Sequence, residues 1–112
     1  IDNATASLIN SYHKEKKKVV AVGTTVVRTL ESAYDEKSDS IVSGMGKTNL
    51  FIKPPYDFKV VDHLLTNFHT PESTLLVLVS TFATKEKIFN SYQHAIKNNY
   101  RFFSYGDAMY IK

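Results

Sequence analysis

The sequence of 112 residues contains no cysteine, no tryptophan and no long hydrophobic run. The absence of cysteine excludes disulfide bonds, thiolate zinc sites and a cysteine nucleophile. The longest apolar run, residues 75–79 (LLVLV), is far shorter than the roughly 20 residues that a membrane-spanning helix needs, and no charged-then-apolar leader is visible. We therefore expect a cytoplasmic protein with no membrane partner.

The sequence also lacks a large excess of charge of one sign. It has 14 Lys and Arg residues and 11 Asp and Glu residues, which gives a net charge of +3. This excess permits a polyanionic partner without requiring one. Apolar residues at 43% and charged residues at 22% are ordinary values for a globular chain. They exclude a disordered tail and a coiled coil, so we expect a packed core.

One segment combines a short apolar strand, a Gly-Thr-Thr turn and an amphipathic helix. Residues 19–22 (VVAV) are typical of a buried parallel strand, residues 23–25 form the turn, and residues 26–33 continue as a helix. Open α/β sheets bind ligands at such turns, where free helix N–H groups attract anions. Two alternatives stay open: the threonine hydroxyls cap the helix, and Arg28 pairs with Glu31 on the surface.

The N-terminal half outside this segment predicts a helix and two loops. A helix capped by Asp2 or Asn3 is expected to end in the lysine-rich residues 14–18, either as a solvated helix end or as a phosphate-facing patch. Residues 35–48 are rich in Ser, Gly and charge and predict a mobile loop. Residues 49–52 predict a strand, which two prolines then end.

The C-terminal half predicts two further helices. Thr70 is the expected N-cap of the first, with Pro71 at its first position and residues 75–79 buried. The second begins at Thr84 and carries an apolar stripe. Since helices alternate with short apolar strands, we predict the α/β class: part of an α/β domain with short, mostly parallel strands flanked by helices.

Polar side chains gather near the expected start of the first of these helices. Asn67 and His69 precede it, and histidine is well suited to proton transfer, although a structural hydrogen bond is the alternative. Ser73 and Thr74 can present hydroxyls to a ligand or cap the helix. His63 and His69 are six residues apart, which matches no zinc motif, so we predict no metal.

The C-terminal tail, residues 100–111, crowds five rings around a Gly-Asp turn. Burial among these rings can perturb the protonation of Asp107, whereas a turn aspartate that binds its own backbone is the alternative. The rings can stack on a nucleic-acid base or pack in the core. Those considered for stacking are Phe102, Phe103, Tyr105 and Tyr110.

Three stretches, taken together and in order, resemble the S-adenosylmethionine:tRNA ribosyltransferase-isomerase family of queuosine biosynthesis: residues 21–32, 48–82 and 100–111. The resemblance implies a C-terminal fragment, residues 1–112, of the α/β domain of a longer two-domain enzyme, inactive by itself. It implies that the complete protein, a monomer without a metal, moves and isomerises the ribosyl moiety of S-adenosylmethionine. The acceptor is the aminomethyl-deazaguanine wobble base of tRNA, and the products are epoxyqueuosine, adenine and methionine.

The family's motifs also indicate a candidate site. We expect His69 and Asp107 to transfer protons and a second group of residues to bind S-adenosylmethionine, the co-substrate. The expected binding residues are Gly23, Thr24, Thr25, Arg28, Asn67, Ser73 and Thr74. The alternative function is a non-catalytic nucleotide- or RNA-binding α/β module, for which the basic run and the aromatic tail suffice.

Overall fold

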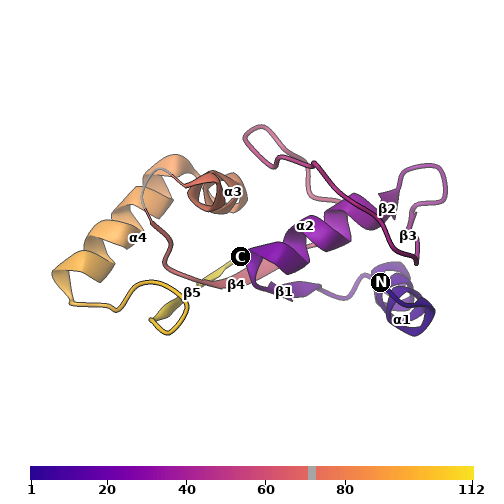
Figure 1. Cartoon of the computed structure of the whole chain (residues 1–112), viewed down its shortest axis with the longest axis horizontal. Coiled ribbons are helices and arrows are strands. Elements are labelled where there is room, and N and C mark those ends of the chain that lie inside the picture. Colours follow the sequence, from indigo (N-terminus) through magenta and orange to yellow (C-terminus); the bar gives the residue numbers. More distant parts are fainter. Residues whose placement is uncertain (71–72) are drawn as a thin grey trace.

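A small mixed sheet lies at the centre of the computed structural model, which describes residues 1–70 and 73–112 (Figure 1). Strand β1 (Val20–Val22) pairs in parallel with β4 (His63–Asn67), and β4 pairs antiparallel with β5 (Ala108–Ile111). The α/β class is confirmed, while parallel pairing is limited to β1 and β4. Strand β5 runs antiparallel because residues 101–107 turn the chain back beside the carboxyl end of β4.

The helices of the described residues flank one side of this sheet and both ends of the molecule, which measures 45 × 23 × 23 Å (Figure 1). They are α1 (Asn3–Lys14), α2 (Thr24–Ala33), α3 (Thr74–Phe82) and α4 (Lys85–Lys97). As predicted, Asp2 caps α1 by accepting the Thr5 N–H at 2.7 Å, and Thr84 caps α4. Among residues 1–70 and 73–112, no helix has the length and apolar character to cross a membrane.

Helix α3 begins later than the sequence suggested. Its N-cap is Ser73, whose hydroxyl oxygen accepts the Leu76 N–H at 3.2 Å, so the prediction of Thr70 as the N-cap is wrong. Serine and threonine satisfy the free N–H groups of a first turn in the same way, so the pattern did not decide between them. The expected first-turn residues Pro71 and Glu72 lie outside the described residues.

Residues 49–52 form no strand, contrary to the prediction, because they pair with no strand of the described chain. They cross α2 instead, where the Thr48 hydroxyl bonds to that of Ser32 at 2.6 Å and accepts the Leu50 N–H at 3.0 Å. Ile52 points into the core and is buried. The apolar pattern of this segment therefore indicated burial and not pairing.

A small antiparallel ribbon, β2 (Tyr34–Asp35) and β3 (Ser40–Ile41), begins one residue before the segment 35–48 that was expected to be a mobile loop and extends into its first half. The Asp35 carboxylate holds its turn by accepting the Ser38 N–H at 3.0 Å and the Ser38 hydroxyl at 2.7 Å. The Asn10 side chain joins α1 to the ribbon through both backbone groups of Ile41, at 2.9 and 2.7 Å. Local Ser and Asp side chains thus order a stretch without hydrophobic periodicity.

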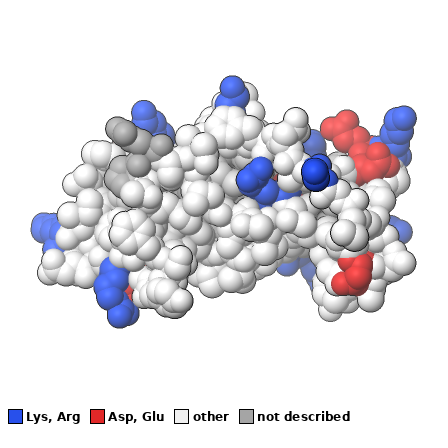
Figure 2. Space-filling model, viewed as in Figure 1, with Lys and Arg blue, Asp and Glu red and all other residues white. Residues whose placement is uncertain are grey.

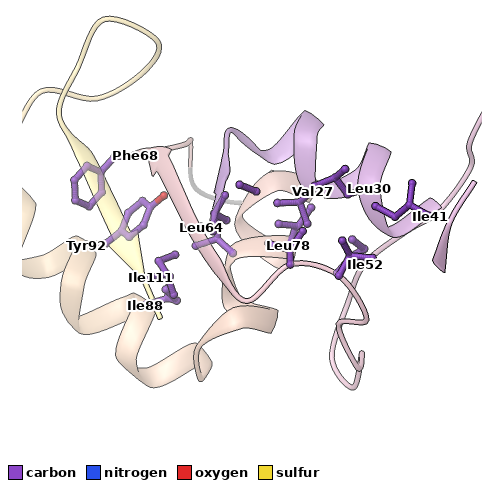
Figure 3. Close-up of a cluster of buried hydrophobic side chains, with 14 of the residues drawn as sticks. Val27, Leu30, Ile41, Ile52, Leu64, Phe68, Leu78, Ile88, Tyr92 and Ile111 are labelled. Atoms are coloured by element: carbon purple, nitrogen blue, oxygen red, sulfur yellow. The ribbon is translucent and has the colours of Figure 1, made fainter. Parts of the chain in front are cut away.

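The core lies between the sheet and the helices on its one covered face (Figure 3). Val27 of α2, Leu64 of β4 and Val79 of α3 have no exposed surface, and they anchor the three elements on one another. The opposite face of the sheet is open, because Val22 is 65% exposed while its neighbour Ala21 is 1% exposed. The prediction of a buried strand at residues 19–22 is therefore right for one face only.

Candidate functional site

The two parallel strands end side by side, as the Gly23 N–H, which donates to the Leu65 carbonyl at 2.8 Å, shows. Strand β1 passes through Gly23 directly into α2, and β4 ends at Asn67, two residues before His69. Both candidate motifs therefore lie beyond the carboxyl ends of adjacent parallel strands. This is the location at which open α/β sheets bind ligands.

Gly23 gives the turn after β1 an open, uncapped helix start. Its φ of 93° lies in the left-handed region that disfavours other residues, and a Cβ there would meet nothing within 4 Å. Gly23 itself is the N-cap of α2, so the cap residue supplies no side-chain hydrogen bond to the first-turn N–H groups. The hydroxyls of Thr24, which is buried, and Thr25, which is exposed, form no hydrogen bond with a described residue, so the threonine-cap alternative is wrong.

His69 is partly buried beside β4. Its Nε2 lies 3.0 Å from the Thr66 hydroxyl, and its backbone N–H donates to the Tyr92 hydroxyl at 2.8 Å. Burial lowers the pKa of the His69 imidazole below its usual value of 6.5. The ring is therefore neutral at pH 7 and able to accept a proton.

Asn67 and Asp107 lie together, but the Asp107 carboxylate is engaged in its own turn. The Asn67 amide donates to the carbonyls of Gly106 and Asp107, both at 3.3 Å. The Asp107 Oδ2 accepts the Arg101 N–H at 2.7 Å and lies 3.9 Å from the Arg101 Nε. This geometry matches the alternative of a turn aspartate. The Asp107 carboxylate stabilises the loop beside Asn67.

Glycine is required at position 106 of this turn. A Cβ on Gly106 would lie 2.5 Å from the Phe102 carbonyl oxygen and closer still to that of Arg101, and both are backbone atoms. We expect Gly106→Ala to lower the free energy of unfolding by about 1–3 kcal/mol, the usual cost of overpacking, in a urea titration of the complete protein.

The matched control for that substitution is Gly46→Ala. A Cβ on Gly46 would meet no described atom within 4 Å, and the φ of Gly46 lies outside the left-handed region. We expect this variant to unfold at the wild-type urea concentration. Equal midpoints for Gly106→Ala and the wild type would show that the turn adapts at no cost.

Arg28 and Thr74 line a neighbouring cavity instead. It has a volume of about 230 Å³ and lies between α2, the start of α3 and residues 49–52. The Arg28 Nε is buried there and has no hydrogen-bond partner among residues 1–70 and 73–112. Ser73 is not among the lining residues, and its hydroxyl is occupied in capping α3. Apart from Ser73, the predicted residues therefore fall into two groups, one at the strand ends and one in this cavity.

Glu31 is a structural side chain whose buried position the sequence reasoning did not identify. It is 6% exposed and accepts hydrogen bonds from residues 56–61, so the alternative of a surface pair with Arg28 is wrong. The burial of Glu31 could have been predicted from the helical period. Residues three and four apart share a helix face, and Val27 and Leu30 are buried on the face that contains Glu31. Asn49, which also lines the Arg28 cavity, had no comparable signal.

The lysine-rich residues 14–18 have the features of a solvated helix end. Lys17 pairs with Glu15 at 2.6 Å and Lys18 with Asp62 at 2.7 Å. On the face shown in Figure 2, Lys and Arg residues are scattered and form no continuous patch. Within the described ranges, no group of three or more His, Asp or Glu side chains could hold a metal, and the predicted absence of a metal remains a prediction.

The rings of the C-terminal tail divide between core and surface. Phe102 contacts Phe68 and Tyr92 in the core, with ring centroids 5.3 and 5.9 Å apart. Tyr105 is 98% exposed, and Phe103 is also exposed. Core packing therefore accounts for Phe102, while base stacking by the exposed rings remains a prediction.

Comparison with known proteins shows one consistent match. A model of the family described as queuosine biosynthesis protein matches residues 1–111. The S-adenosylmethionine:tRNA ribosyltransferase-isomerase of Treponema denticola is 54% identical over 111 residues, which are 99% of this chain and 32% of that protein. The enzyme of the same name from Psychrobacter arcticus is 56% identical over 114 residues, 99% of this chain and 28% of that protein.

The fold matches a solved structure as well. The crystal structure of S-adenosylmethionine tRNA ribosyltransferase from Thermotoga maritima aligns with a TM-score of 0.85 and 46% identity, over 97% of this chain and 38% of that chain. The chain thus spans about a third of the length of the curated relatives it matches.

Proposed function

The chain belongs to the queuosine biosynthesis protein family, and from this premise we propose that it is part of an S-adenosylmethionine-dependent tRNA ribosyltransferase-isomerase. The complete protein transfers and isomerises the ribosyl moiety of S-adenosylmethionine onto the aminomethyl-deazaguanine wobble base of tRNA. The products are epoxyqueuosine-containing tRNA, adenine and methionine. The chain supplies part of the α/β domain of this longer, two-domain enzyme, which acts as a cytoplasmic monomer without a metal.

The observation that carries the proposal is the 54% identity to a relative of that name over 99% of this chain. The placement of the motifs supports it. Gly23 and Asn67 stand at the carboxyl ends of neighbouring parallel strands, where a ligand can meet the free N–H groups of a helix start. Packing alone does not require this open, uncapped turn.

The proposed reaction needs a base for an acidic proton beside the sulfonium, and His69 is the residue best suited to this role. Its imidazole is neutral at neutral pH because burial lowers its pKa, so the ring can accept a proton. The Thr66 hydroxyl, 3.0 Å from Nε2, fixes the orientation of the ring. The Asp107 carboxylate acts indirectly, because it shapes the turn that Asn67 holds.

The test uses the complete protein with S-adenosylmethionine and tRNA that carries the precursor base, and it follows adenine release by chromatography. We expect release only when both substrates are present. A well-folded complete protein that released no adenine would contradict the enzyme proposal. If it also bound tRNA without S-adenosylmethionine, with affinity that fell steeply with salt, the RNA-binding alternative would be favoured.

A further inference from the structure

The cavity beside Arg28 combines one cationic group with an apolar wall. Its volume of about 230 Å³ corresponds to about eight water molecules at the volume each takes in the liquid. The lining consists of Arg28, Asn49, Leu50, Phe51, Ile52, Thr74, Leu75 and Leu78. It therefore suits a small ligand group that is charged at one end and aliphatic along its length.

The charged end of the cavity has unused donors. The Arg28 Nε is buried and bonds to no described residue, and among residues 1–70 and 73–112 Arg28 pairs with no carboxylate. The N–H groups of Thr74 and Leu75 in the first turn of α3 donate to no described residue. A buried donor without a partner is costly, and an anion held by a guanidinium and helix N–H groups would satisfy it.

The wall opposite these donors is fixed in place. Ser32 and Thr48 join α2 to the segment that crosses it, through hydroxyls 2.6 Å apart, and Ile52 anchors the segment in the core. Leu75 and Leu78 of α3 close the other side. The cavity is therefore a built feature of three elements and does not depend on a single surface side chain.

We infer that this cavity binds the amino-acid arm of S-adenosylmethionine, with its carboxylate on Arg28 and the α3 N–H groups and its methylene groups against the leucines. The inference rests on the proposed function, which supplies S-adenosylmethionine as the ligand. The carboxylate is the one anionic group of that molecule, and it is matched here by a single cation. A tRNA phosphate with its ribose would leave the apolar wall of the cavity unused.

The test compares two ligands in the complete protein by calorimetry: S-adenosylmethionine and its decarboxylated analogue. Arg28→Gln is expected to weaken S-adenosylmethionine binding about tenfold to a hundredfold, as loss of a charge-assisted hydrogen bond does. The same substitution is expected to leave binding of the decarboxylated analogue within about threefold, because the group that Arg28 holds is absent from it. Equal weakening of both ligands, or of neither, would overturn the inference.

Two further variants complete the test. Lys53→Gln removes an exposed charge outside the cavity lining and controls for the loss of net charge, so it is expected to change neither affinity. Asn49→Asp places a negative charge in the lining at an exposed residue whose side chain bonds to no described residue, and it is expected to weaken the carboxylate ligand selectively. If Arg28→Gln does not fold, Asn49→Asp alone decides the test. An equal change in its affinity for the two ligands, relative to wild type, overturns the inference.

The adenine-release assay separates the two proposals. Adenine release by the wild type, with no selective effect of Arg28→Gln or Asn49→Asp, would leave the proposed function standing and remove the carboxylate site. A wild-type protein that bound neither ligand would contradict both.

Discussion

Replacement of Glu31 by alanine is expected to lower the free energy of unfolding by about 3–5 kcal/mol. The buried carboxylate accepts the backbone N–H groups of Lys59, Val60 and Val61 at 3.0, 3.0 and 2.9 Å, and the Tyr56 hydroxyl at 3.2 Å. Alanine would leave the buried N–H groups of Val60 and Val61 without an acceptor, at about 1–3 kcal/mol for each, and would also remove the acceptor of the part-buried Lys59 N–H and Tyr56 hydroxyl. The cost is larger than that of an ordinary lost contact because several donors depend on one side chain.

Urea titration of the complete protein, combined with hydrogen exchange at the Val60 and Val61 amides, measures this effect. Both amides are expected to lose protection in Glu31→Ala, since their acceptor is gone. Glu36→Ala is the matched control, because Glu36 is an exposed acid three residues outside α2. Unchanged protection in Glu31→Ala would show that other groups hold the segment before β4.

The role of Glu31 shows what the sequence could reveal about this fold. The helical period placed Val27, Leu30 and Glu31 on one face of α2, and the structure buries all three. A surface pair with Arg28 was an open alternative for Glu31, because the groups that donate to its carboxylate lie 25–30 residues away in an irregular segment. Periodicity identifies the buried face, but it does not identify which distant backbone groups meet it.

The candidate site likewise has one part that neighbouring residues predict and one part that depends on distant residues. The Gly-Thr-Thr turn was predictable from its neighbours in sequence, because a strand and a helix on either side define its place at the sheet edge. The cavity of Arg28 was not, because residues 49–52 form its wall and their apolar pattern predicted a strand. Only the folded chain brings Asn49 to the start of α3 beside Arg28, about 20–25 positions away in the sequence on either side.

Replacement of His69 by asparagine is expected to lower the rate of adenine release about 10²–10⁴-fold, the usual contribution of a general base. Asparagine keeps a polar side chain beside the Thr66 hydroxyl but cannot accept a proton at neutral pH. The fold should tolerate the change, because Tyr92 bonds to the backbone N–H of residue 69 and not to its ring. His94→Asn, at an exposed histidine on α4, is the matched control and should retain the wild-type rate.

The pH profile separates a proton acceptor from a merely structural histidine. Burial lowers the pKa of His69 below 6.5, so the ring is neutral and able to act as a base throughout the range above that value. In the wild type, kcat/KM for adenine release should therefore fall only as the pH drops below 6.5 and the ring becomes protonated. The residual activity of His69→Asn should lack this acidic limb. An unchanged limb in the variant would assign the titrating group elsewhere, and wild-type turnover by a folded variant would remove His69 from the proposed mechanism.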